Sequence, residues 1–151
     1  MLAELNELYQ QAILRHSRHP QNFRALPEAD RTAVGNNPLC GDHYTVFLKL
    51  ADEQIVDLSF TGAGCAVSKA AGSLMTETLK GKTVSEARNL ADNYNAMLRT
   101  GEVDEQLGES QSLAGVHHFP TRIKCALLPW EAMRAALNSS TKEVSTQEVA
   151  G

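Results

Sequence analysis

Apolar residues in the first part of the chain recur every three or four positions. Between residues 2 and 18 these positions are Leu2, Leu5, Leu8, Tyr9, Ala12, Ile13 and His16. This is the spacing of one face of an α-helix, and Pro20 is expected to stop the helix just after residue 18. Residues 19–31 predict a loop. Thr32–Val34 predict a short strand that leads into the turn-forming residues 35–38.

The period then changes from helical to alternating. Tyr44–Leu50 and Val56–Phe60 each alternate apolar with polar residues, which is typical of strands with one buried face. Only Ala51–Gln54 and one further residue separate them, so the two strands predict an antiparallel hairpin.

Helical patterns return in the second half of the chain, over residues 65–79, 84–98 and 121–137. The middle helix opens with a capping box at Thr83 and Glu86. Pro129 lies inside the last helix, where its missing N–H is expected to bend the chain. Residues 100–119 show little periodicity, so they predict a long loop with one helical turn at most.

Together these elements predict an α+β fold, with a small three-stranded antiparallel sheet covered by helices. The length of 151 residues fits one core, and we assign it to a single domain over residues 1–138. Residues 139–151 are polar and are expected to form a mobile tail.

Composition excludes several classes of function. The net charge of −4 offers no basic surface for nucleic acid. No apolar run approaches the ~20 residues that span a bilayer, and the N-terminal segment does not read as a secretory signal. The three cysteines, an odd number, then indicate a reducing compartment, so we expect a cytoplasmic protein.

Each cysteine lies where the chain favours a reactive or metal-binding thiolate. Cys40 is in the turn-rich segment 35–42. Cys65 begins a predicted helix, where free N–H groups and the helix dipole lower a thiol pKa. Cys125 directly follows Lys124 near the start of the last helix. The spacing matches no compact zinc-finger pattern, so three buried structural thiols are an alternative at this point.

The segments around the cysteines resemble the three cysteine motifs of the U-type iron–sulfur cluster assembly proteins. They read Asn-Pro-Leu-Cys-Gly-Asp at 37–42, Gly-Ala-Gly-Cys-Ala-Val-Ser at 62–68 and Arg-Ile-Lys-Cys-Ala-Leu at 122–127. Leu8–Gln10 and His19–Asn22 are also similar to the N-terminal helix and loop of this family. The resemblance extends over residues 2–137 and implies the same α+β class, with the SufE/NifU-like fold.

Within this family, two features resemble the SufU branch. The IscU scaffold branch has a histidine directly before the third cysteine, where this chain has Lys124. The stretch between the second and third cysteines is also long, with residues 100–119 as the additional segment. SufU-type proteins are zinc-dependent sulfurtransferases that serve a SufS-type cysteine desulfurase and the downstream iron–sulfur assembly machinery.

This resemblance implies a role for each site residue. The zinc ligands would be Cys40, Asp42, Cys65 and Cys125. Cys40 would also accept the persulfide sulfur. Because thiolates and a carboxylate bring excess negative charge to zinc, nearby cations should matter. Arg122 is expected to supply one to the catalytic site, and Lys124 a second.

Two other functions stay open. A scaffold that assembles a [2Fe–2S] cluster would use the same cysteines, since clusters also take thiolate ligands. A cysteine hydrolase built on Cys40 has little support, because no Cys–His pair lies in a recognisable oxyanion setting. His43 and the His117–His118 pair are weaker candidates as metal ligands, while His16 and His19 are expected at the surface or the edge of the core.

Overall fold

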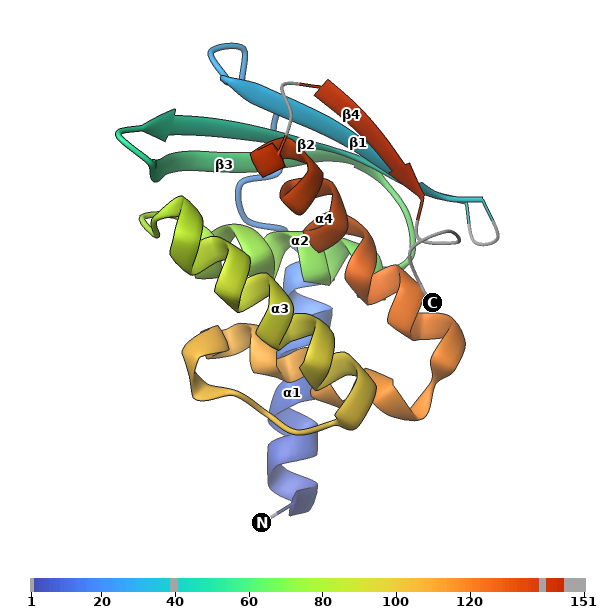
Figure 1. Ribbon diagram of the computed structural model, residues 1–151. Helices are drawn as coiled ribbons and strands as arrows, with labels where there is room; N and C mark the ends of the chain where they lie inside the picture. The colour runs from blue at the N-terminus through green and yellow to red at the C-terminus, as the bar shows by residue number, and fades with distance from the viewer. Residues whose placement is uncertain (1, 39–40, 139–140, 146–151) are drawn as a thin grey trace.

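The computed structural model describes residues 2–38, 41–138 and 141–145. They form an α+β fold in which the four α-helices lie on one side of a single sheet (Figure 1). In chain order the elements are α1 (Leu2–Arg18), β1 (Arg31–Asn37), β2 (Asp42–Ala51), β3 (Gln54–Ala63), α2 (Ala66–Leu79), α3 (Val84–Thr100), the 3-10 helix η1 (Glu105–His118), α4 (Pro120–Asn138) and β4 (Thr141–Ser145). The predicted fold class is confirmed.

The sheet has the strand order β3-β2-β1-β4, and β1, β2 and β3 are antiparallel. The predicted hairpin is β2–β3, with Val46 opposite Phe60. Both of these side chains are fully buried on the face that the helices cover. The alternation in the sequence therefore identified the strands and their inner face correctly.

Strand β1 is longer than the sequence predicts. Gly35 and Asn37, expected in a turn, pair with Tyr44 and Asp42 of β2. A Cβ on Gly35 would lie 3.0 Å from Cδ1 of Leu128 in α4. The glycine here allows a helix to approach the strand closely and does not form a turn.

Residues 141–145, which were expected in a mobile tail, form β4. This strand pairs in parallel with β1, with Val34 opposite Glu143. The polar segment has no clear alternation of apolar and polar residues, so no strand is predicted there. The rest of the predicted tail, residues 139–140 and 146–151, lies outside the described residues.

The segment predicted as a long loop is mostly the 3-10 helix η1, broken at Gly108, where φ is 56°. Its apolar residues Leu107, Leu113 and Val116 are buried, although they do not recur at a helical period. The capping box of Thr83 and Glu86 is confirmed at the start of α3.

The core lies between the sheet and the helices. Tyr94 of α3 stacks on Trp130 of α4, with ring centroids 4.1 Å apart. The helix α4 continues through the buried Pro129 and contacts β1, β2 and α2. It therefore carries Cys125 into the centre of the molecule. Among the described residues, no helix has the length and apolar character needed to cross a membrane.

Candidate metal centre

Three residues that are distant in sequence meet at one end of the sheet. Asp42 is the first residue of β2, Cys65 lies between β3 and α2, and Cys125 is in the second turn of α4. The hairpin register pairs His43 with Ala63 and so brings Asp42 close to the start of α2. One carboxylate oxygen of Asp42 and the two sulfurs all lie within 4.8 Å of one another.

Hydrogen bonds hold this group in place. The backbone N–H of Cys65 donates to Oδ1 of Asp42 over 2.9 Å, and Sγ of Cys65 lies 3.9 Å from Oδ2. Cys65 is the N-cap of α2, and its sulfur accepts from the N–H of Ser68 at 3.5 Å. The side chains of Asp42 and Cys125 are buried, whereas Cys65 is partly exposed.

The pKa values of the two thiols are shifted in opposite directions. The hydrogen bond from Cys125 lowers the pKa of Cys65 to about 5, and the N–H and hydroxyl of Ser68 act in the same direction. The same hydrogen bond, together with burial, raises the pKa of Cys125. The thiolate form is therefore favoured at Cys65 and disfavoured at Cys125.

Arg122 lies one turn before Cys125 and reaches both sulfurs. Its guanidinium is exposed, and the negative charge of Cys65 and Cys125 raises its pKa further. Lys124, the second predicted cation, is half-buried. Arg122 therefore lies beside the two sulfurs, and its role in catalysis stays a prediction.

The donor set suits zinc. Tetrahedral zinc with Zn–S bonds of about 2.3 Å places its ligand atoms about 3.5–3.8 Å apart. Here Sγ of Cys65 lies 3.9 Å from Oδ2 of Asp42, and all three ligand atoms lie within 4.8 Å of one another. Asp42, Cys65 and Cys125 could therefore hold a zinc ion with little movement. Cys40, the fourth predicted ligand, lies outside the described residues.

The histidines weighed as ligands are not in this cluster. His43 is exposed, and strand alternation directs it away from the face that carries Asp42 and Tyr44. His118 is exposed as well, and His117 contacts the carbonyl of Ala114. Among the described residues, the cluster consists of one carboxylate and two thiols.

Two hydroxyl groups behind the cluster were not anticipated. Oη of Tyr44 lies 2.9 Å from Oγ of Ser68, and both side chains are fully buried. Burial raises the pKa of Tyr44 to about 12, so the phenol keeps its proton at neutral pH. A signal was present in the sequence, since Tyr44 shares a strand face with Asp42 and Ser68 is three residues beyond Cys65.

A second group of possible ligands joins α1, α2 and η1. His16 is buried, contrary to the expectation of a surface or edge position, and its Nε2 lies 3.0 Å from Oε1 of Glu109 and 3.6 Å from Oε1 of Glu77. Its Nδ1 lies 2.6 Å from Oγ of Ser73. Arg15 also pairs with Glu109, so these charges already have partners within the protein.

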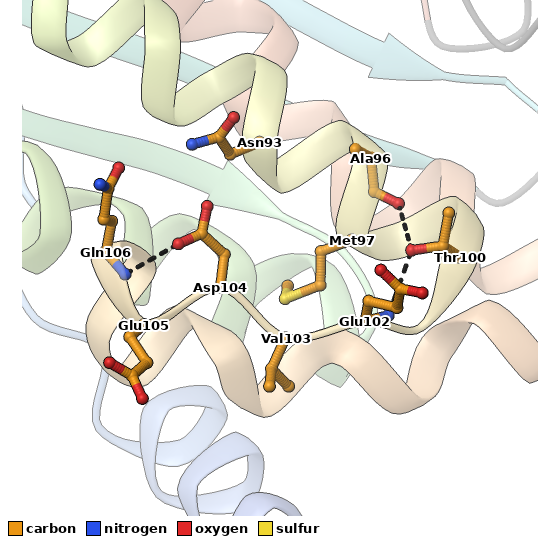
Figure 2. Close-up of a pocket in the computed structure, with 9 residues that line it drawn as sticks. All are labelled: Asn93, Ala96, Met97, Thr100, Glu102, Val103, Asp104, Glu105 and Gln106. Carbon is orange, nitrogen blue, oxygen red and sulfur yellow. Dashed lines mark hydrogen bonds between the residues drawn. The ribbon is translucent and has the colours of Figure 1, made fainter.

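Two of the hollows on the surface lie near segments discussed above. One, of about 560 Å³, is formed by the end of α3 and the start of η1 (Figure 2). Its polar groups serve the local turn, since Asp104 accepts from the N–H of Gln106, and Thr100 binds Ala96 and Glu102. It contains no cysteine or histidine. The other, about 380 Å³, is a more apolar groove that ends at Arg122 beside the metal centre.

Comparisons with known proteins identify the family of this chain. The chain matches the family model of the NifU-like N terminal domain over residues 8–144. It is 38% identical to the iron-sulfur cluster assembly scaffold protein IscU of Streptococcus pyogenes serotype M1, covering 92% of this chain and 88% of that protein. It is also 38% identical to the zinc-dependent sulfurtransferase SufU of Bacillus subtilis (strain 168), covering 87% and 90%.

Solved structures give the same result. A candidate iron-sulfur cluster assembly scaffold protein for the SUF system, from Fervidobacterium islandicum AW-1, superposes with a TM-score of 0.80 at 33% identity. The match covers 87% of this chain and 97% of that one. The chain therefore belongs to the NifU-like N-terminal domain family, which comprises the IscU and SufU proteins of iron–sulfur cluster assembly.

Proposed function

We propose that this protein is a zinc-dependent sulfurtransferase that accepts persulfide sulfur from a SufS-type cysteine desulfurase. The main support is the convergence of Asp42, Cys65 and Cys125, with Arg122 at both sulfurs. The similarity to the SufU of Bacillus subtilis favours the same function. So does Lys124, which stands where the IscU branch has a histidine.

In this proposal zinc is held by Asp42, Cys65 and Cys125, with Cys40 as the fourth ligand. When bound, the metal keeps thiols deprotonated at neutral pH and shields them from random oxidation. The protein supplies the rest of the site. The surroundings of Cys65 lower its pKa and favour the thiolate, and the N–H of Cys65 binds the carboxylate of Asp42, so part of the ligand set is preorganised.

The transfer step is an exchange between sulfur atoms. The thiolate of Cys40 attacks the outer sulfur of a persulfide on the desulfurase. A new S–S bond forms on Cys40, the S–S bond of the donor breaks, and the donor cysteine leaves as a thiolate. Arg122 is exposed beside the sulfurs, where its charge attracts the anionic persulfide and offsets the negative charge of the site.

The second candidate function is a scaffold for a [2Fe–2S] cluster. It is supported by the equal similarity to the IscU of Streptococcus pyogenes, which is named a scaffold protein. Thiolates bind either zinc or a cluster, so the cysteines alone do not distinguish the two functions. Elemental analysis of protein purified without chelators does. About one zinc per chain supports sulfur transfer, and iron with sulfide supports the scaffold.

Sulfur acceptance can be located directly. The protein is incubated with a cysteine desulfurase, pyridoxal phosphate and cysteine, alkylated, and digested for mass spectrometry. We expect the extra sulfur on Cys40, and we expect Cys40→Ser to abolish stimulation of desulfurase turnover. Extra sulfur on Cys65 or Cys125 would contradict the role of Cys40. Binding of iron and sulfide with no modified cysteine would favour the scaffold.

The role of Arg122 has its own comparison. Arg122→Gln should slow sulfur acceptance about 10-fold, because it removes the charge beside the sulfurs. Arg99→Gln is the matched control, since Arg99 is also an exposed arginine on a helix but binds Asn95 on its own helix. Equal rates in the two variants would show that Arg122 is not part of the catalytic site.

A further inference from the structure

A buried phenol lies directly behind the metal centre. Tyr44 is on the inner face of β2, two residues after Asp42, and its side chain is fully buried. Its hydroxyl lies 2.9 Å from Oγ of Ser68 in the first turn of α2. A buried phenol costs free energy unless it is hydrogen-bonded, so the contact with Ser68 matters for both groups.

Ser68 in turn faces Cys65 through two groups. Its N–H lies 3.5 Å from the sulfur, and its hydroxyl oxygen lies 3.6 Å from the same sulfur and 3.1 Å from the Cys65 carbonyl oxygen. The hydroxyl has a single proton and therefore a choice between two acceptors. A thiolate, being charged, accepts the stronger hydrogen bond.

Tyr44 influences that choice. When the phenol donates its proton to Oγ of Ser68, the phenol oxygen is no longer an acceptor for the serine, and the serine proton stays available to the sulfur and the carbonyl oxygen of Cys65. The direction of the Ser68 proton is then restricted by the position of Tyr44. Without the phenol, the serine hydroxyl is free to turn.

The surroundings leave this arrangement little freedom. A Cβ placed on Gly64 would lie 2.6 Å from each of three oxygens, which belong to Asp42, Tyr44 and Ser68. The two hydroxyls and the ligand carboxylate thus converge on one glycine. The phenyl ring of Tyr44 also packs against Phe60, with ring centroids 5.8 Å apart.

We propose that Tyr44 is a positioning residue of the metal centre, and that it acts through the hydroxyl of Ser68 to direct a hydrogen bond onto the sulfur of Cys65. The proposal rests on the proposed zinc-binding function. Outer hydrogen bonds of this kind orient metal ligands and adjust their donor strength. In a protein whose Cys40 leaves the metal during transfer, Cys65 must remain a fixed ligand, and Tyr44 contributes to that.

Cobalt(II) in place of zinc provides a test that does not depend on activity. A hydrogen bond to a thiolate moves the thiolate-to-cobalt charge-transfer band to higher energy. Tyr44→Phe keeps the ring and removes the hydroxyl, so its band should move to lower energy than in the parent protein. Its dissociation constant for zinc, measured against a chelator, should rise about 10-fold.

A double-variant comparison separates positioning from packing. Ser68→Ala should give the same direction of change, and Tyr44→Phe should add no further shift in a Ser68→Ala background. Tyr94→Phe is the matched control, because it removes a fully buried phenol hydroxyl that donates to the carbonyl of Ala126. It should lower stability and leave the band unchanged.

The outcomes are distinct. If Tyr44→Phe lowers stability but leaves both the band and the zinc affinity unchanged, Tyr44 is only a packing residue and the inference is overturned. Additive shifts in the double variant would overturn the action through Ser68. If the parent protein shows no thiolate-to-cobalt band, the proposed zinc site itself fails, and the inference fails with it.

Discussion

The sulfur of Cys65 lies at the N-terminal end of helix α2. The residue is the N-cap of α2, so its sulfur lies beside the unpaired N–H groups of the first turn, and that of Ser68 is 3.5 Å away. The thiol of Cys125 adds a further hydrogen bond. These donors stabilise negative charge at Cys65, even before a metal binds.

This leads to a prediction for the metal-free protein. Because the pKa of Cys65 is lowered from 9.0 to about 5, its reaction with iodoacetamide should follow a titration with a midpoint near pH 5. The thiol form predominates below this pH, so the rate should fall there. Rates measured by mass spectrometry between pH 4 and about 9 test this, with denatured protein as control. A midpoint near 9 in the folded protein would contradict it.

The same shift affects folding. Between about pH 5 and 9 the unfolded chain carries a proton on Cys65 that the folded chain lacks, so the metal-free protein should gain stability as pH rises through this range. Cys125, whose pKa is raised, acts in the opposite direction above pH 9, where the unfolded thiol ionises first.

For single residues, the sequence was informative where the signal is local. Asp42, Cys65 and Cys125 each stand in a short motif, and the structure brings these three together. The contact between Tyr44 and Ser68 joins residues 24 positions apart and depends on how β2 meets α2. Local spacing places each of these residues near a candidate ligand, but no local pattern encodes the contact between them, so that contact required the structure.

At the scale of elements, the connection from β3 to α2 carries most of the constraint on the site. Gly64 lies in this connection, against the oxygens of Asp42, Tyr44 and Ser68. The absence of a side chain there lets the strand pass into the helix beside the carboxylate. A larger residue at position 64 would displace the side chains that pack around it and would disturb the N-cap at Cys65.

Gly64→Ala should therefore damage the metal centre. The added methyl group would force the three oxygens apart, and we expect a loss of about 1–3 kcal/mol of stability and at least a 10-fold weaker affinity for zinc. Urea unfolding and chelator competition measure the two effects. Gly115→Ala is the control, because no atom lies within 4 Å of its added Cβ. Similar zinc affinities in the two variants would contradict the prediction.

The pattern of apolar and polar residues predicted most of the elements. The helices α1, α2, α3 and α4 and the hairpin β2–β3 all follow the predicted pattern. The same pattern did not predict η1, whose buried apolar residues are irregularly spaced, or β4, which is held by backbone pairing to β1. In both cases the structure depends on the surface already formed by the other elements.

At the scale of the whole molecule, His16 connects three segments. It reaches Ser73 on α2 and Glu109 on η1 from its own position on α1. The N-terminal helix and the long segment before α4 are therefore tied to the same point. Because the buried imidazole of His16 contacts both α2 and η1, the packing of α1 against one depends on its packing against the other.

His16→Ala should accordingly lower the free energy of unfolding by about 2–4 kcal/mol, since it removes buried packing and leaves Ser73 and Glu109 without this partner. His19→Ala, at an exposed position three residues later, should change it by less than about 0.5 kcal/mol. Urea unfolding of both variants provides the comparison. A loss below about 1 kcal/mol for His16→Ala would mean that the contacts are replaceable.

The order of the proposed zinc ligands along the chain has a consequence for biosynthesis. A chain grows from its N-terminus, so β2, β3 and α2 are made before α4, which carries Cys125. A partly synthesised chain therefore contains Asp42 and Cys65 but lacks the buried sulfur, and fewer ligands hold zinc less firmly. Cys125 joins Asp42 and Cys65 when α4 packs against β1 and β2. Retention of the metal would then distinguish a finished molecule from an incomplete one.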